Sequence, residues 1–189
     1  MFSGALLGQS GFSLAAVLGM NASQMAGDGL SGFNKVGLHA GLKTGYVLSS
    51  RWDLNLEFLY TQKGSQPRWR DSNFNGQKTI LSYAEIPVYA TFNDWYIEED
   101  NYYKVGLHAG AAYGRLISAK SGIGSISDNI ENIKGFDASF LFGGFYAFNK
   151  KWVMTLRYTN SVIRIYKSDN LSNDGLISYL WTLRMEYNF

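Results

Sequence analysis

The chain ends in ISYLWTLRMEYNF, residues 177–189, and this stretch decides the fold. Every second residue is aromatic or aliphatic, and polar residues fill the positions between them, with Leu180 as the exception. Successive side chains of a β-strand point to opposite sides, so this period of two predicts a strand with one apolar and one polar face. The same alternation recurs upstream, in residues 152–158 and 52–60.

Counting such segments along the chain gives eight expected strands. They lie near residues 11–21, 35–49, 52–64, 78–93, 102–119, 136–149, 151–166 and 176–189. Most exceed the ~9–11 residues that a tilted strand needs to cross a membrane. Eight is also the smallest usual number of strands in a bacterial outer-membrane barrel. The segment near residue 12 lacks the basic start of a signal peptide, so we interpret it as a strand and expect any export signal to be missing already.

The connections between these segments alternate in length. Those after the first, third, fifth and seventh segments are long and polar, whereas those after the second and sixth are very short. Outer-membrane barrels have long extracellular loops and short periplasmic turns. We therefore predict one all-β domain over residues 1–189, an eight-stranded antiparallel up-and-down transmembrane β-barrel with both termini on the periplasmic side.

Composition narrows the function classes. The 189 residues carry 17 Lys and Arg against 15 Asp and Glu, so the chain shows no nucleic-acid footprint. Cysteine is absent, which excludes disulfides, thiolate metal sites and a cysteine nucleophile. We expect no cofactor and no bound metal.

Alternation alone does not distinguish a membrane barrel from a soluble lipocalin-type barrel, which has the opposite face inside. The apolar face carries residues such as Trp52, Phe58 and Trp181, which are too bulky for the interior of eight strands. The opposite face carries many glycines, including Gly41, Gly110 and other residues small enough for a narrow lumen. We therefore expect the bulky face to contact lipid.

The polar face then places charges of both signs inside the barrel. These residues are Lys43, Asp53, Glu57, Lys63, Glu85, Lys104, Asp137, Arg157, Arg184 and Glu186. An isolated buried charge is costly, so we expect them to pair and to fill the lumen as a salt-bridged plug. A narrow channel is the alternative that such a plug disfavours.

The hexapeptide VGLHAG occurs at residues 36–41 and again at residues 105–110, and it carries both histidines of the chain. On the predicted strands, His39 and His108 point inward between glycines. They lie on separate strands and at different heights in the barrel, so we do not expect them to share a zinc ion. We expect the two histidines to join the lumen network with Lys43, Glu57, Glu85, Arg157, Arg184 and Glu186.

Four stretches of the chain resemble the PorT-like family of outer-membrane β-barrels from Gram-negative bacteria. They are WDLNLEFLYTQKGS at residues 52–65, YAEIPVY at residues 83–89, LRYTNSVIRIY at residues 156–166 and GMNASQMAGDGLSGFNKVGLHAGL at residues 19–42. The resemblance covers nearly the whole chain. It implies an eight-stranded barrel in the outer membrane without enzymatic activity. The founding member is linked to protein secretion, which the resemblance does not carry over to this chain.

The resemblance also implies partners. The terminal Phe189, after alternating apolar residues, looks like the signal by which such barrels engage the barrel assembly machinery, although it is equally the last lipid-facing residue. The bilayer, lipopolysaccharide and other outer-membrane proteins are further expected partners. The protein is accordingly expected to act as a structural or binding module, either alone or as a subunit of a larger secretion, assembly or uptake complex of the envelope.

One short stretch offers a candidate binding site. In the second long connection, Arg68, Trp69 and Arg70 place two guanidinium groups around an indole, a combination suited to lipopolysaccharide phosphates or a sugar ring. A solvated loop is the plainer interpretation. The alternative of a barrel lipase or protease needs a base at the rim, and neither His39 nor His108 has an evident serine and acid beside it.

Pro87 lies inside the fourth strand, which predicts a bulge or an unpaired backbone group facing the lumen.

Overall fold

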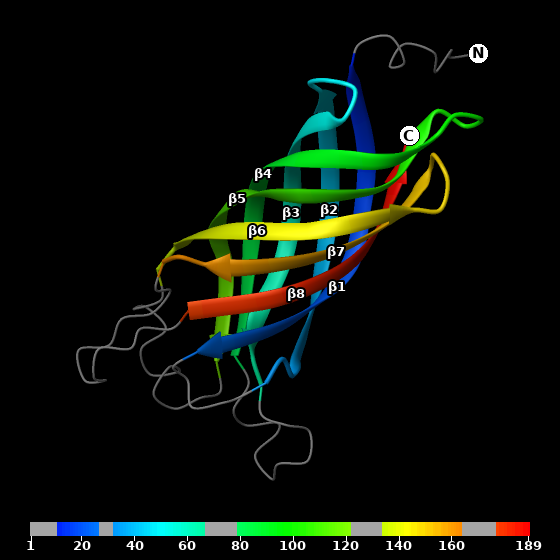
Figure 1. Cartoon of the computed structure of the whole chain (residues 1–189). Coiled ribbons are helices and arrows are strands. Elements are labelled where there is room, and N and C mark those ends of the chain that lie inside the picture. Colours follow the sequence, from blue (N-terminus) through cyan, green and yellow to red (C-terminus); the bar gives the residue numbers. More distant parts are fainter. Residues whose placement is uncertain (1–10, 27–31, 67–78, 122–133, 164–176) are drawn as a thin grey trace, which may run out of the picture.

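The computed structural model describes residues 11–26, 32–66, 79–121, 134–163 and 177–189. In these ranges the chain forms eight strands: β1 Phe12–Ala26, β2 Lys35–Val47, β3 Trp52–Ser65, β4 Thr79–Ile97, β5 Tyr102–Ser121, β6 Phe136–Ala147, β7 Trp152–Ser161 and β8 Ile177–Asn188. Each strand pairs antiparallel with its neighbours in sequence, and β1 also pairs with β8, which closes the barrel (Figure 1). The predicted fold is confirmed. The described part of the chain holds no helix long and apolar enough to span a bilayer.

Two strands run well beyond their predicted ends, by five residues in β1 and by four in β4. β1 continues past residue 21 to Ala26, because β8 pairs with it as far as Ile177. β4 continues past residue 93 to Ile97 and forms a long hairpin with β5, whose last pair joins Ile97 to Tyr102. Conversely, β7 ends at Ser161, short of the expected residue 166.

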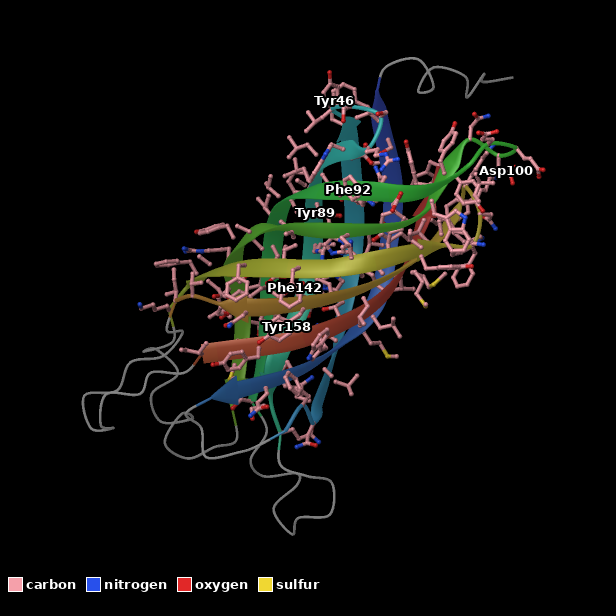
Figure 2. The ribbon with its side chains drawn as sticks, in the orientation of Figure 1. Tyr46, Tyr89, Phe92, Asp100, Phe142 and Tyr158 are labelled. Carbon is pink, nitrogen blue, oxygen red and sulfur yellow. The ribbon has the colours of Figure 1, made fainter. Side chains whose placement is uncertain are left out.

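The two faces of the wall separate as predicted. In β8, the exposed Trp181 and Leu183 alternate with Thr182 and Arg184, which are buried inside the barrel. Aromatic side chains stack along the outer wall, for example Phe142 and Tyr158 with ring centroids 5.3 Å apart (Figure 2). At the end of the short turns, an aromatic belt is formed by the ring pairs Phe12–Tyr46, Trp52–Phe92, Trp152–Tyr187 and Tyr187–Phe189. Belts of this kind mark membrane–water interfaces.

Two irregularities interrupt the ladders around β4. The pairing of β3 with β4 stops at Leu56–Val88 and resumes at Leu59–Glu85, so it is interrupted where the buried Pro87 lacks a backbone donor. The register shift lies elsewhere, between β4 and β5, where Ser82 pairs with Ser118 but Tyr83 pairs with Leu116. Ile117 is therefore the extra residue of a β-bulge.

Candidate functional site

The centre of the lumen is organised by one carboxylate, Glu57, which is fully buried on β3. Arg157 of β7 donates to it from Nη1 to Oε2 at 2.8 Å and from Nη2 to Oε1 at 3.1 Å. Arg184 of β8 donates from Nη2 to Oε1 at 2.5 Å and from Nη1 to Oε2 at 3.0 Å. The hydroxyl of Tyr89 donates to Oε1 at 2.5 Å. Since β3 does not adjoin β7 or β8, these bonds cross the barrel interior.

The network continues toward the short turns through Glu186. Its Oε1 accepts from Arg184 Nε at 3.0 Å and Nη2 at 2.7 Å, and from the Thr155 hydroxyl at 2.8 Å. Its Oε2 pairs with Lys43 Nζ at 2.7 Å. Charge-assisted, bidentate bonds of this kind are the strongest that side chains make, and they are what permits such charges to be buried.

A second cluster lies toward the long connections and has the opposite arrangement. Here the cation, Lys63, is central and fully buried. Its Nζ lies 2.6 Å from Glu85 Oε1 and 2.7 Å from Asp137 Oδ2. Ser161 also donates to Asp137 Oδ2 at 2.8 Å. Across both clusters four cations (Lys43, Lys63, Arg157, Arg184) face four anions (Glu57, Glu85, Asp137, Glu186), so their formal charges cancel.

Both histidines of the repeated hexapeptide point into this network and are buried, at 3% and 5% exposure. His108 Nε2 accepts from Arg157 Nε at 3.2 Å, and its ring lies 5.1 Å from that of Tyr89. His39 Nε2 lies 3.4 Å from Arg184 Nη1, and its Nδ1 lies 3.2 Å from the Thr61 hydroxyl. Arginine can only donate, so in each histidine Nε2 is the acceptor and Nδ1 carries the proton.

A glycine makes room for one of these contacts. A Cβ at Gly143 on β6 would lie 2.3 Å from the carbonyl oxygen of Leu156 and 2.8 Å from His108 Nε2. Only a residue without a side chain allows the strands and the imidazole to come this close.

The structure therefore brings most of the predicted lumen residues together. His39, Lys43, Glu57, His108, Arg157, Arg184 and Glu186 form one connected network, and Glu85 joins Lys63 and Asp137 in the other cluster. The inward prediction for Lys104 is wrong. Its ammonium lies at the rim, 4.7 Å from the Trp95 ring centroid and 5.6 Å from that of Tyr146. The reason is that Lys104 lies just beyond Val105–Tyr146, the last residue pair between β5 and β6 at this end. Asp53 faces the lumen opening and accepts from Asn93 at 2.6 Å.

One central residue was not anticipated. Tyr89 donates to Glu57 and stacks under Arg157, whose guanidinium carbon lies 4.6 Å from the ring centroid. Its position two residues after Pro87, in alternation with the outward Val88, is the signal in the sequence that indicates an inward side chain.

Two further predictions concern Arg68, Trp69 and Arg70, and the terminal Phe189. Arg68, Trp69 and Arg70 lie outside the described residues. Phe189 is 73% exposed beside Tyr187, and its backbone N–H donates to Leu14 at 3.1 Å, which places it on the outer wall at the seam of β8 and β1. Within the described ranges, no group of three or more His, Asp and Glu is arranged to hold a metal ion.

At the short-turn end the lumen opens into a vestibule of about 270 Å³. Its lining includes Asp53, Asn55, Thr91, Asn93 and Lys43. Lys43 is 22% exposed and pairs with the buried Glu186, which is 1% exposed. Water can therefore enter from this end but meets the charged network below it.

A closed eight-stranded barrel with an apolar, aromatic-belted outer wall and an ion-paired interior defines the class of integral outer-membrane barrels. Within that class, the sequence profile of the outer membrane protein beta-barrel domain family matches residues 8–167, and the chain belongs to this family. The protein is thus an outer-membrane protein.

Solved structures show the same fold. Ail, the attachment invasion locus protein of Yersinia pestis, is 18% identical, with a TM-score of 0.53 over 95% of this chain and 99% of Ail. Ail in complex with the heparin analogue sucrose octasulfate gives a TM-score of 0.51 at 18% identity over 94% and 99% of the two chains. Neisserial surface protein A (NspA) is 15% identical, with a TM-score of 0.49 over 95% and 98%. No curated protein matches the chain in sequence.

Proposed function

We propose that the protein is a non-enzymatic outer-membrane barrel that serves as a structural or binding module, with its long connections outside the cell and both termini in the periplasm. The observation that carries this proposal is the ionic network across the lumen. Two arginines from β7 and β8 form salt bridges with one carboxylate from β3, and these bonds connect opposite walls of the barrel. An interior bonded in this way stiffens the barrel and leaves the rims and loops to make contacts.

A narrow channel is the first alternative, and conductance tests it. We expect the purified barrel in planar bilayers to show no stable, large conductance, because the Glu57 carboxylate and its two guanidinium groups occupy the lumen. The double variant Glu57→Ala/Arg157→Ala removes two of these groups without leaving a net charge, and should give measurable current steps. A stable, large conductance of the unmodified barrel would overturn the plugged interior.

An enzyme is the second alternative. Both histidines use Nε2 to accept from arginine, and the hydroxyl near His39 belongs to Thr61 inside the lumen, away from any rim. Neither imidazole is free to take a proton from a nucleophile at the surface. Hydrolysis of phospholipid or peptide by the purified barrel, abolished by His39→Ala, would support the enzyme instead.

For the ligand, we propose that Arg68, Trp69 and Arg70 bind lipopolysaccharide phosphates. Support comes from their chemistry and from Ail, a barrel of the same fold that has been crystallised with a polysulfated sugar. Arg68→Ala/Arg70→Ala should weaken binding of lipopolysaccharide to the barrel in neutral detergent. The control is Arg51→Ala/Lys150→Ala, which removes the same charge from the short-turn end. Equal affinity of the two double variants would remove this idea.

Orientation has a direct test because the chain lacks cysteine. A membrane-impermeant maleimide should label Ser72→Cys in intact cells and leave Ser49→Cys unlabelled until the outer membrane is opened. The reverse pattern would place the termini outside.

We also propose that the protein belongs to the PorT-like group of Gram-negative barrels, that residues 1–189 form one domain, and that Phe189 is read by the barrel assembly machinery. Phe189→Ala should lower the amount of folded protein in the membrane. The control is Phe148→Ala, which removes another exposed phenylalanine, 52% exposed against 73% for Phe189. Extraction in mild detergent tests membership of an envelope complex: co-purifying outer-membrane proteins would support it, and a chain that runs alone would favour an independent module.

A further inference from the structure

A polar groove lies on the outer wall, where lipid-facing residues should be apolar. It lies on β3, β4 and β5 near the long connections and has a volume of about 290 Å³. Its polar lining consists of Tyr60, Gln62, Ser82, Ser118 and Lys120. Further down β5 the outward residues Leu107 and Tyr113 are exposed and largely apolar, as expected for the bilayer.

The polar groups of the groove form a row of hydrogen bonds across neighbouring strands. Gln62 Oε1 accepts from the backbone N–H of Leu38 at 3.4 Å, and Gln62 Nε2 donates to the Tyr60 hydroxyl at 3.0 Å. Tyr60 in turn donates to the Ser82 hydroxyl at 3.0 Å. Such groups are costly in the hydrocarbon core, so a row of them marks the level of the lipid headgroups.

The bulge at Ile117 creates the far side of this groove. Up to Leu116, even-numbered residues of β5 face the lumen, as His108, Ala112 and Gly114 show by their burial. The extra residue reverses this parity, so Ser118 pairs with the outward Ser82 and Lys120 pairs with Ile80. Without the bulge, the Lys120 side chain would point inward. Instead its ammonium group is exposed on the outer wall, next to the 61% exposed Ile117.

We propose that this groove binds the headgroup of a phosphorylated glycolipid of the outer leaflet. Lys120 faces a phosphate, Gln62 and Ser118 face sugar hydroxyl groups, and Ile80 and Ile117 contact the first carbons of an acyl chain. The combination of a cation, neutral hydrogen-bonding groups and flanking aliphatic residues matches a lipid with a sugar–phosphate head. A soluble protein partner is a poorer fit, because the groove lies on the wall that faces the membrane. The inference rests on the proposed orientation, in which the long connections are outside.

The experiment measures the affinity of the whole purified barrel in neutral detergent for fluorescent bis-phosphorylated lipid A and for fluorescent phosphatidylglycerol. We expect the unmodified barrel to prefer lipid A. Lys120→Gln should weaken lipid A binding about fivefold, the value of one lysine near an anionic membrane surface. Ser118→Val should weaken lipid A but leave phosphatidylglycerol unchanged. The matched control is Lys151→Gln, which removes an exposed lysine at the opposite end and should change neither affinity.

Several outcomes would overturn the site. Equal affinity for the two lipids would show general attraction to anionic lipid, and an effect of Lys151→Gln as large as that of Lys120→Gln would show the same. The unaltered migration of folded barrel on unheated gels checks that each variant is intact. If cysteine labelling reverses the orientation, the proposed function and this site fail together. If labelling supports the orientation and Lys120→Gln binds lipid A like the unmodified barrel, only this site fails.

Discussion

The two ionic clusters of the lumen solve the same problem with opposite signs. In the Glu57 cluster (Glu57, Arg157 and Arg184), one anion is shared by two cations, and in the Lys63 cluster (Lys63, Glu85 and Asp137), one cation is shared by two anions. The Glu57 cluster is also better bonded. Near Lys63, Asp137 Oδ1 and the Tyr83 hydroxyl find no hydrogen-bond partner among the described residues. We therefore expect the Glu57 cluster to contribute more to the stability of the barrel than the Lys63 cluster.

The largest effect should come from removing the shared anion. Glu57→Gln keeps the size of the side chain but leaves two buried guanidinium groups without their common partner. Because arginine does not lose its proton in proteins, the charge cannot be relieved. We expect the free energy of unfolding to fall by about 3–5 kcal/mol, as for other broken buried pairs. Urea titrations in phospholipid vesicles, followed by tryptophan fluorescence, measure it.

A compensating variant sharpens this result. Glu57→Gln/Arg157→Met removes one charge of each sign and should recover part of the lost stability, since Arg184 keeps Glu186. A double variant less stable than Glu57→Gln would contradict the charge argument and point to lost packing.

Removing the shared cation should cost less and should depend on pH. Lys63→Met leaves Glu85 and Asp137, which both lie within 2.7 Å of the same Nζ, without a cation. A carboxylate can escape by binding a proton, so we expect a loss of about 3 kcal/mol at pH 7. In the folded variant one carboxyl group takes up a proton that the unfolded chain does not bind. The free energy of unfolding of Lys63→Met should therefore rise as the pH falls from about 7 to about 5.

The Glu57→Gln variant is the control for this pH effect. Glu57→Gln leaves only guanidinium groups behind, so acid should not rescue it over the same range. Recovery of both variants at low pH, or of neither, would break the distinction between the clusters.

The barrel was predictable from sequence because alternation is local, whereas the clusters were not. For residues such as Thr155 and Arg184, the adjacent apolar residues are enough to predict that the side chain points into the barrel. Which inward charges meet depends on the register of all eight strands, and Glu57 finds its partners 100 and 127 residues away. The extension of β1 to Ala26 was missed for a related reason, because pairing with β8 sustains it where the sequence looks like a loop.

The two copies of VGLHAG allow a comparison with a smaller expected effect. The two histidines have the same flanking sequence, but His108 contacts Arg157 and His39 contacts Arg184. Both arginines bond Glu57, but His108 is the acceptor for Arg157 Nε, whereas the Arg184 Nη1 that faces His39 also donates to Glu57. His108→Phe, which keeps a ring but removes the acceptor, should therefore cost about 1–2 kcal/mol. His39→Phe should cost less, since Arg184 keeps strong partners. The same urea titration ranks the two, and a larger loss for His39→Phe would mean that its contact with Thr61 matters more than the arginine contacts.

The smallest effect should come from the ion pairs at the short-turn rim. Asp100 lies 3.9 Å from Lys150 and Asp94 lies 3.8 Å from Arg51, with all four side chains more than half exposed. Water screens such pairs and the long side chains lose freedom in forming them, so each contributes about 0–1 kcal/mol. Asp100→Asn and Asp94→Asn should each change the free energy of unfolding by less than about 0.5 kcal/mol. A loss as large as that of Lys63→Met would mean that the β4–β5 hairpin, which these pairs tie to neighbouring turns, helps to hold the barrel closed, and that burial alone does not separate strong from weak pairs in this protein.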